Sequence, residues 1–208
     1  MTFPGSSPIG LPVVGGSTLS PERADAARNR RLLLAAAQSL IDDQGAAAVT
    51  MDAVARAAGV GKGTVFRRFG NRTGLMHALL DHSESDLQQA FLSGPMPLGP
   101  GAHPLDRLAA YGRARLKMNV DHLDVLLEAG SDDPDRFSHP VWAMSTQHVK
   151  ILLGELGFRH RLDVLAYAIQ APLDAITVRH LLDVVGLTRE QIADDWESMV
   201  RTLVAGTH

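Results

Sequence analysis

The sequence predicts an all-α fold of about nine helices. Apolar residues recur at intervals of three and four along almost the whole chain, which is the spacing that gives a helix one buried face. No segment alternates apolar and polar residues as a half-buried strand would. Runs rich in Gly and Pro separate the periodic segments, so we expect helices joined by loops.

The N-terminal end of the chain differs from the rest. Residues 1–20 mix Gly, Pro and Ser without a helical or strand period, so they predict a flexible tail with no function of its own. A helix is expected to begin at Ser20-Pro21-Glu22, because Ser can cap it, Pro fits its first position and Glu favours its first turn. The remainder divides into a domain of residues 21–70 and a larger helical domain of residues 71–208.

Three helices are expected in the domain of residues 21–70. The first helix ends at Gly45 and has one apolar stripe, formed by Leu33, Ala37, Leu40 and Ile41. Thr50 can cap a short second helix. A Gly-Val-Gly turn at residues 59–61 then leads into a third helix, which closes at Phe69-Gly70.

The larger domain is expected to begin with a long helix capped by Asn71 and running towards Phe91. Residues 93–104 contain three Gly and four Pro, so they form a loop. Beyond this loop the helical phase continues for over twenty residues. This length predicts two helices that meet near Asn119-Val120.

Three further helices are expected towards the C-terminus. A breaker run at residues 130–135 precedes a helix over residues 141–152. The longest apolar stripe covers residues 162–184, where Pro172 should kink the helix by removing one backbone donor. Thr188 can cap the last helix, which has Glu and Gln in its first turn.

Residues 50–69 have the pattern of a helix–turn–helix. Val54 and Ala58 face inward on the first helix, Gly59 permits the left-handed conformation of a sharp turn, and Val60 fills the angle between the helices. On the second helix Val65 and Phe69 lie four residues apart on the buried side. The opposite face is polar and carries Lys62, Thr64, Arg67 and Arg68. A basic, hydroxylated helix face of this kind suits the major groove of DNA.

The charge distribution supports this interpretation more strongly than the net charge does. The whole chain has 20 basic and 23 acidic residues, a net charge of −3, which by itself argues against a nucleic-acid binder. Residues 28–72, however, contain eight basic and three acidic residues, a net of +5. The rest of the chain has 12 basic and 20 acidic residues, a net of −8. Such a split is expected when one domain contacts phosphate and the other does not.

The sequence resembles the TetR family of bacterial transcriptional regulators. The resemblance is close over about residues 28–80, in the run TMDAVARAAGVGKGTVFRRFGNRTGL, and extends more loosely to the C-terminus as helix number and order. It implies a homodimer with an N-terminal three-helix DNA-binding domain. It also implies a larger domain whose last two long helices form the dimer interface, and in which a small molecule respaces the two reading helices.

The resemblance assigns DNA contacts to individual residues. It places Thr50 against a phosphate at a helix N-terminus, where simple capping is an equally good and compatible role. Lys62, Gly63 and Thr64 match the start of the recognition helix, with Gly63 allowing close approach. The remaining matched positions are Phe66, Arg67, Arg68 and Arg72, of which Arg72 stands where a phosphate-binding Lys is usual.

Three residues depart from the family pattern. Gly61 replaces a common capping Ser, which weakens the cap of the recognition helix by a few tenths of a kcal/mol. Phe66 replaces a common Tyr, so a hydroxyl contact is missing and core or domain packing is its alternative role. Gly74 replaces a common acidic residue, so the start of the fourth helix should be less rigid. We hypothesise that Arg67 and Arg68 compensate by adding charge.

The resemblance also places a ligand pocket and a dimer interface in the larger domain. Candidate pocket residues on the middle helices are His82, Arg115, Met118, His122, Phe137, Trp142, Met144 and His148, although such residues are more often core. Candidate interface residues are Leu162, Leu165, Ile169, Leu173, Ile176, Ile192, Trp196 and Met199. These last helices could instead close the core of a monomer.

Composition excludes several classes of site. The chain has no cysteine, so a disulfide, a Cys-based zinc site and a cysteine nucleophile are ruled out. The pairs His77-Asp81 and His82-Asp86 have a spacing compatible with metal ligation but lack an obvious third ligand, so we expect no metal and no cofactor. No apolar stretch approaches the roughly 18–20 residues that span a bilayer, so we expect no membrane contact and a cytoplasmic protein.

The sequence therefore predicts a DNA-binding transcriptional regulator rather than an enzyme. The expected mechanism is a homodimeric repressor that binds a palindromic operator and is released by a small-molecule effector of unknown identity. One alternative is a non-specific architectural DNA-binding protein. A second is an all-helical enzyme using the His and Asp pairs, which would leave the basic cluster unexplained.

Overall fold

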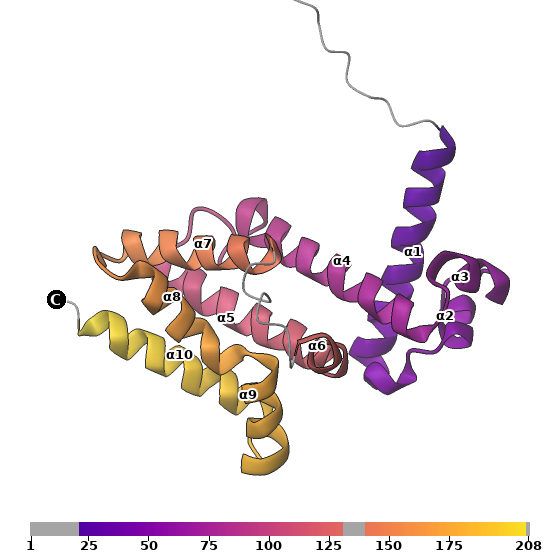
Figure 1. The fold of residues 1–208 in the computed structure, drawn as a ribbon. Helices are drawn as coiled ribbons and strands as arrows, with labels where there is room; N and C mark the ends of the chain where they lie inside the picture. Colours follow the sequence, from indigo (N-terminus) through magenta and orange to yellow (C-terminus); the bar gives the residue numbers. More distant parts are fainter. Residues whose placement is uncertain (1–20, 131–139, 207–208) are drawn as a thin grey trace, which may run out of the picture.

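The computed structural model describes residues 21–130 and 140–206, and within these ranges every regular element is helical (Figure 1). The N-terminal elements are α1 (Pro21–Gln44), a 3₁₀ turn (Ala46–Ala48), α2 (Met51–Ala57) and α3 (Lys62–Phe69). They are followed by α4 (Arg72–Ser93), α5 (Pro104–Asp121), α6 (Leu123–Gly130), α7 (Pro140–Glu155), α8 (Leu162–Gln170), α9 (Ala175–His180) and α10 (Arg189–Ala205). The predicted all-α fold is confirmed. The predicted tail, and residues 131–135 of the predicted break, lie outside the described residues.

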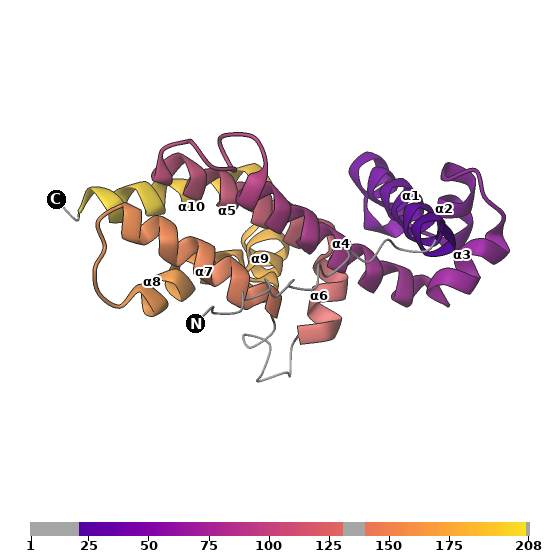
Figure 2. The same cartoon turned by 90° about the horizontal axis from the view of Figure 1, so that it is seen from above.

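Two apolar cores underlie the two ends of the elongated molecule (Figures 1 and 2). The N-terminal core joins α1, α2 and α3 around buried residues such as Leu34, Val54 and Val65. The larger core joins α5, α7, α8 and α10 around residues such as Leu152 and Trp196.

The long helix α4 contributes to both cores. Leu75 and Leu79 in its first half are buried in the N-terminal core, whereas Leu87 and Phe91 in its second half are buried in the larger core. Because α4 is one continuous helix of 22 residues, it connects the cores as a rigid element. The domain boundary expected at residue 70 thus precedes a helix that the two cores share.

The segment expected to form one kinked helix over residues 162–184 is broken into shorter pieces. Helix α8 ends at Gln170, and residues Ala171–Leu173 form a 3₁₀ turn around Pro172, which has no amide hydrogen to continue the helix. Asp174 then restarts the chain as α9 by accepting a hydrogen bond from the Ile176 amide at 3.1 Å. This break makes ten α-helices within residues 21–130 and 140–206, where about nine were expected.

Helices α5 and α10 approach each other closely at Gly112. Gly112 of α5 faces the ring of Trp196, which is 3% exposed and donates a hydrogen bond from Nε1 to the Ile169 carbonyl at 2.8 Å. A methyl group built at Gly112 would lie 1.9 Å from a ring carbon of Trp196. The glycine therefore permits the close approach of these two helices.

Burial divides the residues expected at the dimer interface. Ile169, Leu173, Ile192 and Trp196 are buried within the core of the single chain. Leu162 and Leu165 are partly buried against the same core. Of the expected set, Ile176 and Met199 are the well-exposed members. The spacing identifies the apolar residues of these helices, and the buried members of the set close the core of the protomer.

Candidate nucleic-acid interface

The turn between α2 and α3 has the geometry that the sequence predicts. Thr50 caps α2 by accepting a hydrogen bond from the Ala53 amide at 3.1 Å. Gly59 has a φ of 66°, in the left-handed region that favours glycine, and the Val60 amide donates to the Ala55 carbonyl at 3.0 Å. Val65 is fully buried and Phe69 is 9% exposed, so α3 is fixed by its inner face.

The N-terminal end of α3 is held by charge rather than by a cap. Gly61 occupies the N-cap position and provides no side-chain hydrogen bond, as expected. Lys62 instead forms an ion pair with Asp52 of α2 at 2.7 Å and lies 5.6 Å from the centre of the Phe66 ring. Phe66 is 41% exposed, so it packs beneath Lys62 on the surface rather than in the core.

The outer face of α3 leaves room for a partner. Gly63 is exposed, and a methyl group built there would contact nothing within 4 Å, so another backbone can approach closely. Arg67 is exposed and forms no hydrogen bond or ion pair with the described part of the chain. Thr64 is half-buried between these two residues. Arg67 is therefore a charged group of α3 that is available for phosphate or base edges.

Two of the expected DNA-binding arginines instead hold the N-terminal domain together. Arg68 donates from Nη2 to the Ala26 carbonyl of α1 at 3.0 Å. Arg72 donates from Nε to the Val49 carbonyl at 2.8 Å and from Nη2 to the Ala46 carbonyl at 3.0 Å. The two carbonyls that Arg72 contacts belong to the 3₁₀ turn before α2 and to the residue after that turn, an element that the helical spacing does not predict. Both arginines remain exposed enough to attract phosphate while making these contacts.

Gly74 has a structural role that differs from the expected one. The Asn71 side chain caps α4 by accepting a hydrogen bond from the Gly74 amide at 2.8 Å. A methyl group built at Gly74 would lie 2.2 Å from the Phe69 carbonyl oxygen. The glycine therefore permits the tight α3–α4 junction, and the expectation that it loosens this helix start is corrected.

Further basic side chains extend the positive surface onto α1 and α2. Arg28 and Arg31 of α1 and Arg56 of α2 are exposed. Arg30 lies 5.6 Å from the centre of the Phe69 ring, so it also contributes to packing. The N-terminal domain thus combines a rigid helix–turn–helix with a basic exterior, which is what binding to DNA phosphates requires.

The structural role of Arg72 leads to a first prediction. Arg72→Ala removes two hydrogen bonds from a charged donor to backbone carbonyls, so it should lower the free energy of unfolding by about 1 kcal/mol. Arg56→Ala, which removes an exposed arginine of α2, should change that free energy little. Urea unfolding followed by circular dichroism compares the two variants. Equal stabilities would show that Arg72 does not fasten the turn.

Comparison with known proteins agrees with this geometry. Residues 33–79 match the family model described as "Bacterial regulatory proteins, tetR family". Residues 33–79 therefore have the DNA-binding domain of the TetR family. This match covers the helix–turn–helix and the first part of α4. No curated protein matches the chain significantly.

Solved structures share the TetR fold over most of the chain. A protein of Saccharomonospora viridis described as a transcriptional regulator, in complex with choline, has a TM-score of 0.58 at 18% identity, covering 84% of this chain and 96% of its own. A TetR/AcrR-family regulator from Thermobifida fusca has a TM-score of 0.53 at 17% identity, covering 87% and 99%. A transcriptional regulator of Pseudomonas aeruginosa PAO1 has a TM-score of 0.52 at 19% identity, covering 94% and 97%.

The residues expected to line a TetR-type ligand pocket lie in different places. His82, Met118 and His122 line a groove between α1, α4 and α5. Arg115 belongs to a separate, buried polar cluster, and His148 is buried against the rings of Phe91 and Tyr111. Met144 is 43% exposed. Phe137 lies outside the described residues, and Trp142 lies in α7 with its side chain outside the description.

The buried polar cluster links α4, α5 and α7. Arg115 forms an ion pair with Glu84 at 2.5 Å, donates to the Ser145 hydroxyl at 2.7 Å and lies 5.9 Å from the centre of the Tyr111 ring. The Tyr111 hydroxyl donates to Gln170 at 2.9 Å. Glu84 Oε2 and Arg115 Nε have no hydrogen-bond partner among the described residues. The cluster is therefore only partly satisfied.

Two imidazoles in the larger domain are buried in their neutral form. His148 stacks on Phe91 with ring centres 4.2 Å apart, and His122 forms a hydrogen bond with the Ser83 hydroxyl at 2.9 Å. Burial lowers the pKa of each to about 4, with a further lowering of the His148 pKa by the charge of Arg107.

These shifts predict acid sensitivity. Below pH 6.5 the unfolded chain binds protons at both histidines while the folded chain does not, so stability should fall between pH 6.5 and pH 4. Each histidine contributes up to about 3 kcal/mol to this loss. Urea unfolding at pH 7.5 and pH 4.5 measures it. His148→Phe keeps the stacking on Phe91 and should reduce the pH dependence, and an unchanged dependence would contradict the neutral, buried state.

Proposed function

We propose that this protein is a homodimeric TetR-family repressor that binds a palindromic operator through α3. The observation that carries the proposal is the outer face of α3, where exposed Arg67 and the open backbone at Gly63 stand on a helix fixed by its buried side. A single such helix covers only a few base pairs. Two-fold symmetry supplies the second helix, about 34–36 Å away along the same side of the duplex.

Exposed apolar residues on the last helices support dimer formation. Val164 is 66% exposed on α8, and Ile176 is 48% exposed on α9. Met199 and Leu203 are 42% and 36% exposed on α10, one turn apart. A partner chain that covers this surface would form the homodimer, with the buried neighbours Ile169 and Trp196 stiffening the helices from within.

Helix α4 connects the buried polar cluster to the DNA-binding domain, so it provides a route by which an effector would release the operator. Glu84 of α4 is joined to Arg115 in the buried cluster, while the same helix begins at the Asn71 cap beside α3. A small molecule that binds the unsatisfied groups of this cluster in one conformation of the dimer would shift α4 and hence the spacing of the two α3 helices. The S. viridis protein of the same fold is in complex with choline, so this fold accommodates a small molecule.

A selection on random duplex DNA tests the proposal. The repressor should enrich one palindromic sequence with two half-sites about one helical turn apart. An architectural DNA-binding protein would instead retain DNA without enriching any sequence and would show a steep salt dependence. The TetR-family domain accounts for the basic cluster that an all-helical enzyme would leave unexplained.

Light scattering of the free protein tests the dimer separately. The full chain should have the mass of a dimer at micromolar concentration. Met199→Asp places a charge on the exposed apolar surface of α10 and should shift the mass towards the monomer. A monomer in the wild-type protein would contradict the symmetric mode of binding.

A further inference from the structure

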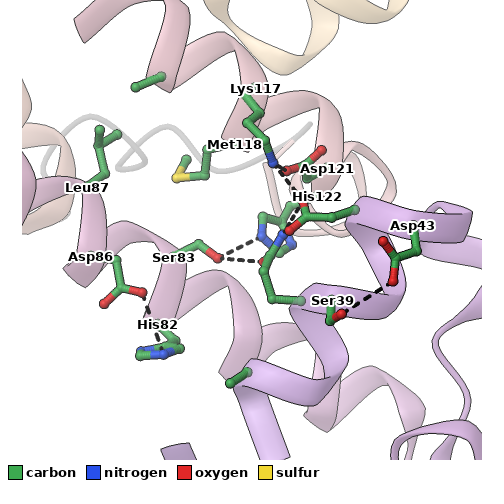
Figure 3. A pocket seen from close by; sticks show the side chains of 14 residues that line it. Ser39, Asp43, His82, Ser83, Asp86, Leu87, Lys117, Met118, Asp121 and His122 are labelled. Carbon is green, nitrogen blue, oxygen red and sulfur yellow. Dashed lines mark hydrogen bonds and ion pairs between the residues drawn. The ribbon is translucent and has the colours of Figure 1, made fainter. Parts of the chain in front are cut away.

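A groove lies between the DNA-binding domain and the larger domain (Figure 3). Its volume is about 570 Å³, within the range of small-molecule sites, and its walls come from the second half of α1, the middle of α4 and the second half of α5. Figure 3 shows Lys117, Asp121 and His122 gathered at one end and His82 with Asp86 at the other. The groove is separate from the buried Glu84–Arg115 cluster, neither of whose residues lines it.

Carboxylates line every wall of this groove. Asp42 and Asp43 come from α1, Asp86 from α4 and Asp121 from α5. Lys117 is the one lysine or arginine among the lining residues, and it joins Asp42 at 2.8 Å and Asp121 at 2.6 Å. The hydrogen bond from Lys117 lowers the pKa of the Asp42 carboxyl, so this acid stays ionised.

Two carboxylates in the groove have no lysine or arginine partner among the residues that the structure describes. Asp43 accepts a hydrogen bond from the Ser39 hydroxyl at 3.4 Å, and Asp86 lies 3.6 Å from Nε2 of His82. Neither forms an ion pair with a lysine or arginine in the described part of the chain. The ammonium group of Lys117 pairs with two carboxylates of this groove. An ammonium group of a ligand would interact with Asp43 and Asp86 in the same way.

A second observation, independent of the acids, points to a ligand. His122 lines the groove and is 1% exposed, and its Nδ1 has no hydrogen-bond partner among the described residues. Its Nε2 pairs with Ser83, whose hydroxyl donates to Gln38 at 3.4 Å, so Nε2 carries the imidazole proton and Nδ1 is left as a bare acceptor. A buried acceptor without a donor is costly, and a ligand with an N–H group would satisfy it.

We propose that this interdomain groove binds a linear organic cation with at least two amine groups, such as a diamine or a polyamine. One ammonium would pair with Asp86 and another with Asp43, and an N–H group would reach Nδ1 of His122. An amine fits better than a metal ion, because no three His, Asp or Glu side chains in the described ranges gather with the geometry of a metal site. A bound polyamine would touch α1 of the DNA-binding domain together with α4 and α5, and so would bias their relative position.

Isothermal titration calorimetry of the full chain with spermidine, at low ionic strength and without DNA, tests this site. Saturable binding is expected, with Asp43→Asn and Asp86→Asn each weakening the affinity about three- to fivefold. Asp81→Asn is the matched control, because Asp81 is an exposed carboxylate of α4 that does not line the groove, and this variant should bind like the wild type. Thermal melting of each variant confirms that it is folded.

Magnesium chloride serves as a second probe with charge but no N–H donors. Spermidine binding that depends on Asp43 and Asp86, with weaker magnesium binding, supports the proposal. No saturable heat with spermidine would overturn it. Equal loss of affinity in Asp81→Asn, or magnesium binding as tight as spermidine binding, would also overturn it, since either would indicate general attraction to an acidic surface. Because the titration contains no DNA, its outcome is independent of whether the protein binds an operator.

Discussion

Replacing Glu84 by Gln should lower the free energy of unfolding by about 3–5 kcal/mol. Glu84 and Arg115 are 8% and 5% exposed and form an ion pair at 2.5 Å inside the larger domain. Burial opposes the charged form of Arg115, but the Tyr111 hydroxyl and Glu84 more than offset this and raise its pKa above the ordinary value. The guanidinium therefore stays charged in Glu84→Gln and is left buried without a counter-charge.

Two comparisons separate this effect from a general loss of packing. The double variant Glu84→Leu/Arg115→Met removes both charges at similar volume and should be markedly more stable than Glu84→Gln. Asp163→Asn breaks the exposed Lys150–Asp163 ion pair and should change stability little. Urea unfolding of all four proteins gives the free energies. A loss below about 1 kcal/mol for Glu84→Gln would show that the pair is solvated.

Replacing Gly112 by Ala should also be strongly destabilising, by about 3 kcal/mol. The added methyl group would lie 1.9 Å from a ring carbon of Trp196, far inside the contact distance of two carbon atoms. The Trp196 ring cannot easily move away, because it is buried and its Nε1 is bonded to the Ile169 carbonyl. Relief would require α5 and α10 to separate and would open the larger core.

Gly154→Ala is the matched control for this prediction. Gly154 lies in α7, and a methyl group built there meets nothing within 4 Å. Alanine in a helix is favoured over glycine by roughly 0.5–1 kcal/mol, so this variant should be equal to or more stable than the wild type. Thermal and urea unfolding measure both changes. Equal effects of the two substitutions would contradict the tight α5–α10 crossing.

The sequence predicts most of the N-terminal domain because the signals there are local. The Thr50 and Asn71 caps, the left-handed Gly59 and the inward Val65 each depend on residues a few positions away. The roles of Arg68 and Arg72 could not be predicted in this way. Their partners are backbone carbonyls 42 and 23 or more residues distant, which composition and spacing do not reveal.

The larger domain shows the limits of periodicity more clearly. The apolar stripe around Ile169 and Trp196 was detected, but spacing alone does not tell whether such a stripe faces the chain's own core or a second copy. The groove at Asp43 and Asp86 joins residues from three helices, so it emerges only when those helices are placed in space. Of the residues expected to share one pocket, His82, Met118 and His122 line this groove, whereas Arg115 lies in the buried cluster.

The central claim is that α3 contacts DNA through its outer face. The affinity of the Arg67→Ala variant for the selected operator duplex tests this claim most directly. Fluorescence anisotropy at several salt concentrations should show about a tenfold loss of affinity and a salt slope smaller by about one. Arg159→Ala, which removes an exposed arginine beyond α7 in the larger domain, should bind like the wild type. Unchanged affinity and salt slope in Arg67→Ala would contradict the claim.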